Sequence, residues 1–240
     1  MSLETKPTNP VTPSSAQPSA DPTDPPAAPT PTPAPMTPAD YLATAAARED
    51  WELPLSDPVR YQQPYRPQFH FSPAAGWLGD PDGMVRFKDL YHVFWWGHAE
   101  SKDLVHWNER LAPMIGDDDS FVYYSGSVVV DRANTSGFGS VGDQPPMIAV
   151  YTMHHKGSNE EDQGLSISYD YKSFVYYDQN PVLDSERPAF RDPQVFWDAQ
   201  NKRWLMIIAL PEDHLVSFYA SNDLKQWTHL SDWGKVGAQE

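Results

Sequence analysis

A seven-residue motif occurs three times in this chain and limits the folds open to it. Each copy reads Ser-x-Asp-x-x-x-aromatic, at residues 101–107, 168–174 and 221–227. Two strand-like runs precede every copy, at residues 83–87 and 90–96, then 125–131 and 146–154, then 193–198 and 203–210. Repeats of roughly 50 to 70 residues without a helical period are typical of four-stranded propeller blades. We therefore predict an all-β propeller with about three blades.

The repeated motif also predicts where each blade begins. Its Ser and Asp side chains are expected to bind local backbone in a turn between outer strands, with the aromatic ring packed between blades. In this register, Asp80-Pro81 and Asp192-Pro193 fall at the first strand of units one and three. Residues 125–127 occupy that place in unit two. Since first strands line the central channel of a propeller, we expect both carboxylates to face one pocket.

The N-terminal segment has a different composition. Residues 1–40 hold 12 of the 25 prolines and no aromatic residue, so they bury too little apolar surface to offset the entropy of ordering. We predict a disordered tail over residues 1–40, a short helix over 41–49 and a partial propeller domain over 41–240. Pro/Thr/Ser-rich segments are typical of extracellular spacers, so we expect a secreted protein, although the N-terminus lacks the apolar core of a signal peptide.

Composition excludes several classes of function. With 17 basic and 33 acidic side chains the formal charge is −16, which disfavours nucleic acid and anionic membranes as partners. No apolar run is long enough for a membrane span. The absence of cysteine excludes disulfides and thiolate chemistry, and there is no His-Glu-x-x-His pair, so we predict no metal or other cofactor. The oligomeric state stays open.

Four stretches carry a family resemblance. They are His70-Phe71-Ser72-Pro73 through Gly83, Trp96-Gly97-His98-Ala99, Tyr124-Ser125-Gly126-Ser127 and Arg191-Asp192-Pro193. In this order, between about residues 69 and 233, they resemble the diagnostic motifs of glycoside hydrolase family 32, the invertases, inulinases, levanases and related fructosyltransferases. The resemblance implies a five-bladed propeller, usually followed by a β-sandwich. It also implies retaining cleavage of β-fructofuranosides such as sucrose, fructo-oligosaccharides, inulin or levan, by hydrolysis or by transfer.

The resemblance implies roles for individual residues. Asp80 would be the nucleophile and Asp192 would hydrogen-bond the fructose hydroxyls in the transition state. The predicted substrate-binding residues are Trp77, Asp82, Trp96, Tyr124, Ser127 and Arg191. Several of these residues also have a structural interpretation. The tryptophans can pack in the core, Ser127 can bind backbone groups and Arg191 can form an ion pair. Trp95 is expected in the core, because adjacent strand residues face opposite sides.

The sequence departs from the family pattern at several points. Gly79 and Asp82 stand where the family usually has Asn, and a carboxyl at Asp82 beside Asp80 is expected to raise one pKa. A Gln-containing segment is missing between residues 93 and 97, so the pocket rim must differ. The general-acid Glu of the family's Glu-Cys-Pro motif does not occur, and Glu240 is a poor substitute because a terminal residue seldom has a fixed geometry. Two alternatives stay open: a non-catalytic fructan-binding propeller, and a fragment inactive by itself.

Overall fold

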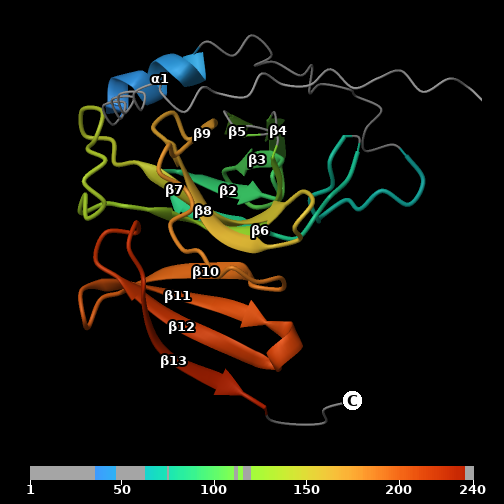
Figure 1. The fold of residues 1–240 in the computed structure, drawn as a ribbon. Coiled ribbons are helices and arrows are strands. Elements are labelled where there is room, and N and C mark those ends of the chain that lie inside the picture. The colour runs from blue at the N-terminus through green and yellow to red at the C-terminus, as the bar shows by residue number, and fades with distance from the viewer. Residues whose placement is uncertain (1–35, 47–62, 75, 111–112, 116–119, 236–240) are drawn as a thin grey trace, which may run out of the picture. The chain divides into compact units, whose positions relative to one another are not determined.

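The computed structural model describes residues 36–46, 63–74, 76–110, 113–115 and 120–235. Strands dominate and form three sheets (Figure 1). The first sheet runs in the order β1 (Gly83–Phe87), β2 (Leu90–Phe94), β3 (His98–Ser101), β4 (Trp107–Arg110). The third sheet runs β10 (Arg191–Asp198), β11 (Arg203–Leu210), β12 (Leu215–Ser221), β13 (Thr228–Gly234). Both are antiparallel meanders, the arrangement of a propeller blade.

The second sheet has the same plan with one added strand. Its strands, in spatial order, are β5 (Met114–Ile115), β9 (Phe174–Tyr176), β8 (Glu161–Ser168), β7 (Met147–His155) and β6 (Phe121–Val130). The short β5 pairs parallel with β9 and covers its outer edge. The predictions of an all-β fold and of three blades are therefore confirmed, and β1 and β11 have the predicted bounds.

The innermost strands of the three blades lie together, because β6 contacts both β1 and β10 (Figure 1). Blade two therefore lies between the other two, and its strand β7 is buried on both faces. Ile148 belongs to the apolar cluster that includes Met206 of blade three. The neighbouring Ala149 and Tyr151 belong to a second cluster with Phe94 of blade one. The continuous apolar run of β7 therefore contributes side chains to both apolar clusters.

The three copies of the repeated motif form equivalent turns, as the sequence predicts. In the third copy, Ser221 Oγ accepts the Leu224 amide at 2.8 Å, and Asp223 Oδ1 accepts the Lys225 and Gln226 amides at 2.9 Å. The residue after the Asp has a positive φ in every copy: Leu104, Tyr171 and Leu224. Each turn joins the third strand of a blade to the fourth, so the motif marks the blade register correctly.

A short helix, α1 (Pro38–Ala46), precedes the blades. Thr37 caps it, since the Asp40 amide donates to Thr37 Oγ1 while Asp40 Oδ2 accepts the Thr37 amide at 2.7 Å. Pro38 suits the first helical position, which lacks an amide partner in any case. The helix therefore starts at Pro38 and not at residue 41, so residues 38–40 do not belong to a disordered tail. Its Tyr41 and Ala45 are buried in the cluster shared by blades two and three.

Residues 1–35 and 47–49, where the rest of the predicted tail and helix fall, lie outside the described residues. Within the described part of the chain, no helix combines the length and apolar character needed to cross a membrane.

Candidate active site

A pocket of about 490 Å³ lies where the loop before β1 meets β6 and β10. It brings Asp80 and Asp192 together across 112 positions of sequence, as the blade register predicts. The residues that line it are Trp77, Leu78, Gly79, Asp80, Asp82, Trp95, Trp96, Tyr123, Tyr124, Ser125, Arg191 and Asp192. Five of the six predicted substrate-binding residues are in this set, and Ser127 is not.

Two β-bulges aim side chains into the pocket. The pairing register of β6 shifts between Tyr123 and Gly126, and that of β10 shifts between Arg191 and Gln194. A bulge inserts an extra residue and redirects the side chains beside it. Asp192 reaches its position with a φ of 63°, in the left-handed region. Gly126 is needed for close approach, since a Cβ there would lie 2.1 Å from the Val150 carbonyl oxygen.

The two carboxyls of the Asp80-Pro81-Asp82 segment have different environments. Asp80 is exposed to the pocket, and Ser125 Oγ donates to its Oδ2 at 3.1 Å. Asp82 is only 3% exposed, and its Oδ1 accepts the Gly126 amide at 3.3 Å. Burial raises the pKa of Asp82 to about 7, hydrogen bonds from Ser125 and Gly126 oppose the shift, and the charges of Asp80 and Asp192 add to it. The pKa moves in the predicted direction, although burial and not Asp80 is the main cause.

Asp192 lines the same pocket from β10. Desolvation at the pocket wall raises the pKa of Asp192; the Arg191 charge opposes this, while Asp80 and Glu161 reinforce it. The Asp192 amide donates to Thr152 Oγ1 at 3.0 Å, so β7 fixes the backbone of this residue. The pocket is therefore lined by three carboxyls, of which that of Asp82 is buried.

Aromatic rings form much of the pocket wall. Trp77 is 84% exposed and lines the pocket without a ring partner among the described contacts. Trp96 lies in the β2–β3 turn at a φ of 55°, and its indole Nε1 donates to the Tyr124 carbonyl at 2.8 Å. Trp95 packs on Phe71 with ring centroids 4.9 Å apart, in keeping with the expected packing role, and it also lines the pocket.

A buried carboxylate on β8, that of Glu161, organises one side of the pocket. Glu161 is fully buried and accepts two hydrogen bonds from Arg191, from Nε at 2.8 Å and from a terminal nitrogen at 2.6 Å. It also accepts the Phe190 amide at 3.0 Å and pairs with His154 Nδ1 at 3.1 Å. The His154 ring stacks on Tyr124, with centroids 4.5 Å apart. Arg191 is thus held in a structural ion pair while it lines the pocket.

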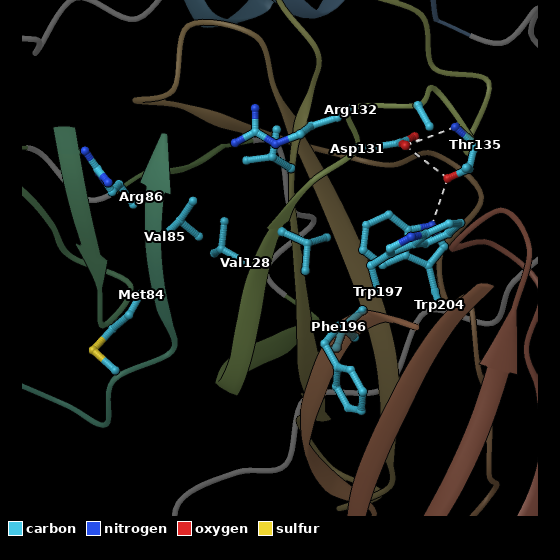
Figure 2. A pocket seen from close by; sticks show the side chains of 14 residues that line it. Met84, Val85, Arg86, Val128, Asp131, Arg132, Thr135, Phe196, Trp197 and Trp204 are labelled. Atoms are coloured by element: carbon cyan, nitrogen blue, oxygen red, sulfur yellow. Dashed lines mark hydrogen bonds between the residues drawn. The ribbon is translucent and has the colours of Figure 1, made fainter. Parts of the chain in front are cut away.

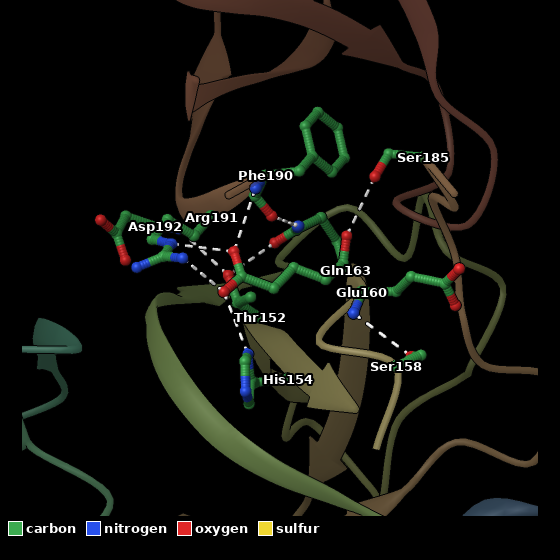
Figure 3. A network of polar contacts seen from close by, with 10 residues as sticks. Thr152, His154, Ser158, Glu160, Gln163, Ser185, Phe190, Arg191 and Asp192 are labelled. Atoms are coloured by element: carbon green, nitrogen blue, oxygen red, sulfur yellow. Dashed lines mark hydrogen bonds and ion pairs between the residues drawn. The ribbon is translucent and has the colours of Figure 1, made fainter. Parts of the chain in front are cut away.

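A second polar chain supports the same wall. Thr152 Oγ1 donates to Gln163 Oε1 at 3.0 Å, and Gln163 Nε2 donates to the Phe190 carbonyl at 2.6 Å (Figure 3). Sequence reasoning missed these residues, together with His154, Glu161 and Ser125. For Thr152 and His154 the available signal is a polar residue within the mainly apolar run of β7, whereas β8 also holds Asp162, Ser166 and Ser168, so Glu161 and Gln163 do not stand out there.

Ser127 does not belong to the pocket. Its Oγ donates to the Pro193 carbonyl at 2.8 Å and accepts the Val195 amide at 2.9 Å, and the residue is buried. Both bonds tie β6 to β10 at the bulge of β10. The assignment of Ser127 to substrate binding is corrected to its structural alternative, a partner of backbone groups. Glu240 lies outside the described residues.

One group among the described residues has the side chains for a metal site: His92, His98 and Glu100. His92 Nδ1 lies 3.1 Å from His98 Nε2, and Arg110 donates twice to Glu100 Oε2. Burial lowers the pKa of both histidines, which favours a hydrogen bond between neutral rings. These contacts satisfy His98 Nε2 and Glu100 Oε2, whereas His98 Nδ1 is buried without a hydrogen-bond partner, and none of the three residues lines the pocket.

A second hollow, of about 560 Å³, lies along the same three inner strands (Figure 2). Its walls are mainly apolar, with Val85, Val128, Phe196 and Trp197 among them. The carboxylate present is Asp131, which accepts hydrogen bonds from the amides and hydroxyls of Thr135 and Ser136. Because those bonds occupy this carboxylate, the hollow lacks a free acid for catalysis.

Comparison with known proteins places these observations in a family. The family model "Glycosyl hydrolases family 32 N-terminal domain" matches residues 70–239. A levanase of Bacillus subtilis (strain 168) is 40% identical over 195 residues, which are 75% of this chain and 28% of the levanase. An extracellular exo-inulinase of Aspergillus awamori is 37% identical over 216 residues, with coverage of 75% and 40%.

Solved structures agree with the sequence matches. The crystal structure of exo-inulinase from Aspergillus awamori aligns with a TM-score of 0.67 at 35% identity, covering 75% of this chain and 42% of that one. The β-fructofuranosidase from Schwanniomyces occidentalis complexed with fructosyl-erythritol aligns with a TM-score of 0.63 at 33% identity, covering 70% and 36%. The chain spans less than half the length of each of these relatives. On these matches, the chain belongs to glycosyl hydrolase family 32 and carries the family's N-terminal domain.

Proposed function

We propose that the protein is a retaining glycosidase or fructosyltransferase that acts on β-fructofuranosides. The observation that carries the proposal is the convergence of Asp80 and Asp192 on one aromatic-walled pocket. Supporting it, relatives are named levanase, exo-inulinase and invertase, and neighbouring structures are described as complexed with fructose and with fructosyl-erythritol. The substrate class is therefore sucrose, fructo-oligosaccharides, inulin or levan.

In this proposal Asp80 is the nucleophile. Its carboxylate attacks the anomeric carbon of fructose and forms a fructosyl ester, while the bond from that carbon to the leaving oxygen breaks and the oxygen takes a proton from a carboxylic acid. Water or the hydroxyl of another sugar then attacks the same carbon, gives up its proton to that acid's conjugate base and releases Asp80. Attack by water gives hydrolysis, and attack by a sugar hydroxyl gives transfer.

The remaining pocket residues bind and orient the sugar. Asp192 accepts hydrogen bonds from fructose hydroxyls, which strengthen as positive charge develops on the ring. Trp77, Trp96 and Tyr124 supply apolar surface for the sugar face, and Arg191 holds the wall beside Asp192. The described carboxyls of the pocket leave the acid unassigned, because Asp82 is buried and Asp192 is assigned to the sugar hydroxyls. The proposal takes the acid from outside the described residues.

We also propose an extracellular location. The Pro/Thr/Ser-rich composition of residues 1–40 supports it, and several relatives are named extracellular exo-inulinases. Fructans and sucrose outside the cell would then reach the pocket directly.

Activity tests the proposal. The purified protein is incubated with sucrose, inulin or levan, and released fructose and transfer products are measured. Replacing Asp80 by Asn should lower kcat by a factor of at least about 10³, because the covalent step is lost. Asp89→Asn, an exposed carboxylate in the β1–β2 turn, is the matched control and should keep full activity. If the unchanged protein yields neither fructose nor transfer products, the catalytic proposal fails.

The second candidate function is a non-catalytic fructan-binding module. It is favoured by Gly79 and Asp82 at positions where the family usually has Asn, and by the unassigned acid. Calorimetry with fructans on the same sample separates the two functions. Heat of binding without turnover supports the module, whereas binding with turnover supports the enzyme.

A further inference from the structure

Tyr124 contributes its ring to the pocket wall from the irregular stretch of β6. We propose that His154 is a positioning residue for the sugar, which holds the Tyr124 ring in place and joins it to the ion pair of Glu161 and Arg191. His154 is not among the described lining residues, so it acts through Tyr124 and not by contact with substrate. The inference rests on the proposed function for the identity of the sugar, and a binding measurement separates the two.

The backbone at Tyr124 lacks the usual support of a strand. The pairing of β6 with β7 is interrupted between Tyr123 and Gly126, so Tyr124 has no partner in that ladder. Its carbonyl oxygen accepts a hydrogen bond from Trp96 Nε1 at 2.8 Å, which holds the main chain and not the ring. The ring needs a contact of its own to keep one orientation, because fixing a side chain costs conformational entropy.

His154 supplies that contact. Its imidazole stacks on the Tyr124 ring with centroids 4.5 Å apart and planes 8° from parallel. Stacked aromatic pairs attract each other beyond the area that they bury. The His154 side chain is only 21% exposed, so it is largely enclosed itself. The orientation of the Tyr124 ring therefore depends on the orientation of His154.

The regular ladder between β7 and β8 fixes His154 in turn. His154 lies directly opposite Glu161, and its Nδ1 is 3.1 Å from Glu161 Oε1. Because an ionised carboxylate only accepts hydrogen bonds, this nitrogen carries the proton. Glu161 also accepts two hydrogen bonds from Arg191 and one from the Phe190 amide, so its roughly four acceptor sites are all filled.

Arg191 completes a closed circuit of contacts around this buried carboxylate. Its guanidinium carbon lies 5.7 Å from the centroid of the Tyr124 ring, within the range of cation–π attraction. The Tyr124 ring is thus bordered by His154 and Arg191, which both bind Glu161. Two lining residues, Tyr124 and Arg191, therefore keep a fixed relative position before substrate arrives, and this reduces the entropy lost on binding.

The next residue of β7 offers a matched control. His155 Nε2 lies 2.7 Å from Asp162 Oδ2, so it forms the same kind of pair with β8. Successive residues of a strand face opposite sides of the sheet, and neither His155 nor Asp162 is among the described lining residues of the pocket. A substitution of His155 therefore removes a His–carboxylate pair without removing the stack on Tyr124.

Steady-state kinetics with sucrose test the positioning role. We expect His154→Leu to raise KM roughly tenfold while kcat stays within about twofold, because the reacting carboxylate is not touched. His154→Phe keeps a stacked ring and loses the donor to Glu161, so its KM should rise about threefold. His155→Leu should leave both constants unchanged. Equal KM values for His154→Leu and His155→Leu would overturn the inference, and an unchanged KM for His154→Phe would contradict the link to Glu161.

A double-mutant cycle shows whether His154 acts through Tyr124. In a chain that already has Tyr124→Leu, adding His154→Leu should not raise KM again, whereas a general structural loss would add its full effect. Calorimetry with fructose measures Kd without turnover and should show the same roughly tenfold difference for His154→Leu. If the chain binds fructose but cleaves no fructoside, the catalytic proposal fails and the Kd values decide the role of His154. If the chain does not bind fructose, both fail.

Discussion

Asp80 and Asp82 lie two positions apart, yet the fold gives them opposite environments. Asp80 is exposed to the pocket, whereas Asp82 lies beneath it with its amide donating to the Phe94 carbonyl at 2.9 Å. The carboxyl of Asp80 can therefore reach a substrate in the pocket, whereas burial raises the pKa of Asp82. Asp80 and Asp82 have the same side chain, so the burial of each, and not its chemical identity, assigns its role.

Gly126 is the residue on which the bulge of β6, beside the two carboxyls, depends most. Replacing it by Ala would place a Cβ 2.1 Å from the Val150 carbonyl oxygen, which is fixed in the β7 ladder. We expect Gly126→Ala to lose about 3 kcal/mol of unfolding free energy, because β6 must move. Urea denaturation measures the loss. Gly137→Ala is the control: φ is 69° there but no atom lies within 4 Å of the added Cβ, so about 1 kcal/mol is expected. Equal losses in the two variants would contradict the steric argument.

Strands β7 and β8 act together as the support of the pocket wall. Their buried polar side chains point toward the start of β10, where they hold Arg191 and the Asp192 backbone. A strand buried on both faces is usually apolar. Four polar residues of these strands, Thr152, His154, Glu161 and Gln163, therefore support the pocket wall, while apolar neighbours such as Ile148 and Leu165 belong to the cores.

Glu161→Gln tests this support. The variant loses a buried charge that binds Arg191 with two hydrogen bonds, which leaves the guanidinium without its anion. We expect a loss of about 3 kcal/mol in unfolding free energy and a higher KM for fructosides. The neighbouring Glu160→Gln changes an exposed carboxylate and should leave both quantities unchanged. Urea denaturation and steady-state kinetics supply the measurements, and a Glu161→Gln variant as stable as Glu160→Gln would refute the assigned role.

The elements show what sequence reasoning can and cannot reach. The turn motif was predictable because Ser and Asp bind backbone within three residues, and its register placed Asp80 and Asp192. Ser127 was placed in the pocket by the family resemblance alone, and its hydrogen-bond partners Pro193 and Val195 belong to a strand distant in sequence. The bulges of β6 and β10 have no sequence signature that can be read from one chain. Partners from distant strands, such as Glu161, have no local signal at all.

At the scale of the whole molecule, blade two couples the stability of the described blades. Both apolar clusters take residues from β7, so neither outer blade has a core of its own. Loss of packing in one cluster therefore weakens the other. The same sharing keeps the three inner strands in place around the pocket.

Cooperative unfolding follows from this shared strand. We expect tryptophan fluorescence and circular dichroism to report a single coincident transition for the chain. Ile148→Ala should lower the midpoint of that transition without splitting it, with a loss of about 3 kcal/mol, because the residue is fully buried in the middle blade. Two separate transitions would show that the blades fold independently.

Because of the two bulges, the side chains that reach the pocket depend on how many residues β6 and β10 contain as well as on which residues these are. Removing a single residue from the β6 bulge would restore an uninterrupted ladder with β7 and would take one of the two pocket-lining residues of the bulge, Tyr124 or Ser125, out of the pocket. Insertions and deletions at this point, as distinct from substitutions, can therefore give a chain of this architecture a differently equipped pocket in one step. The strands of the blade would be retained while the side chains that line the pocket change.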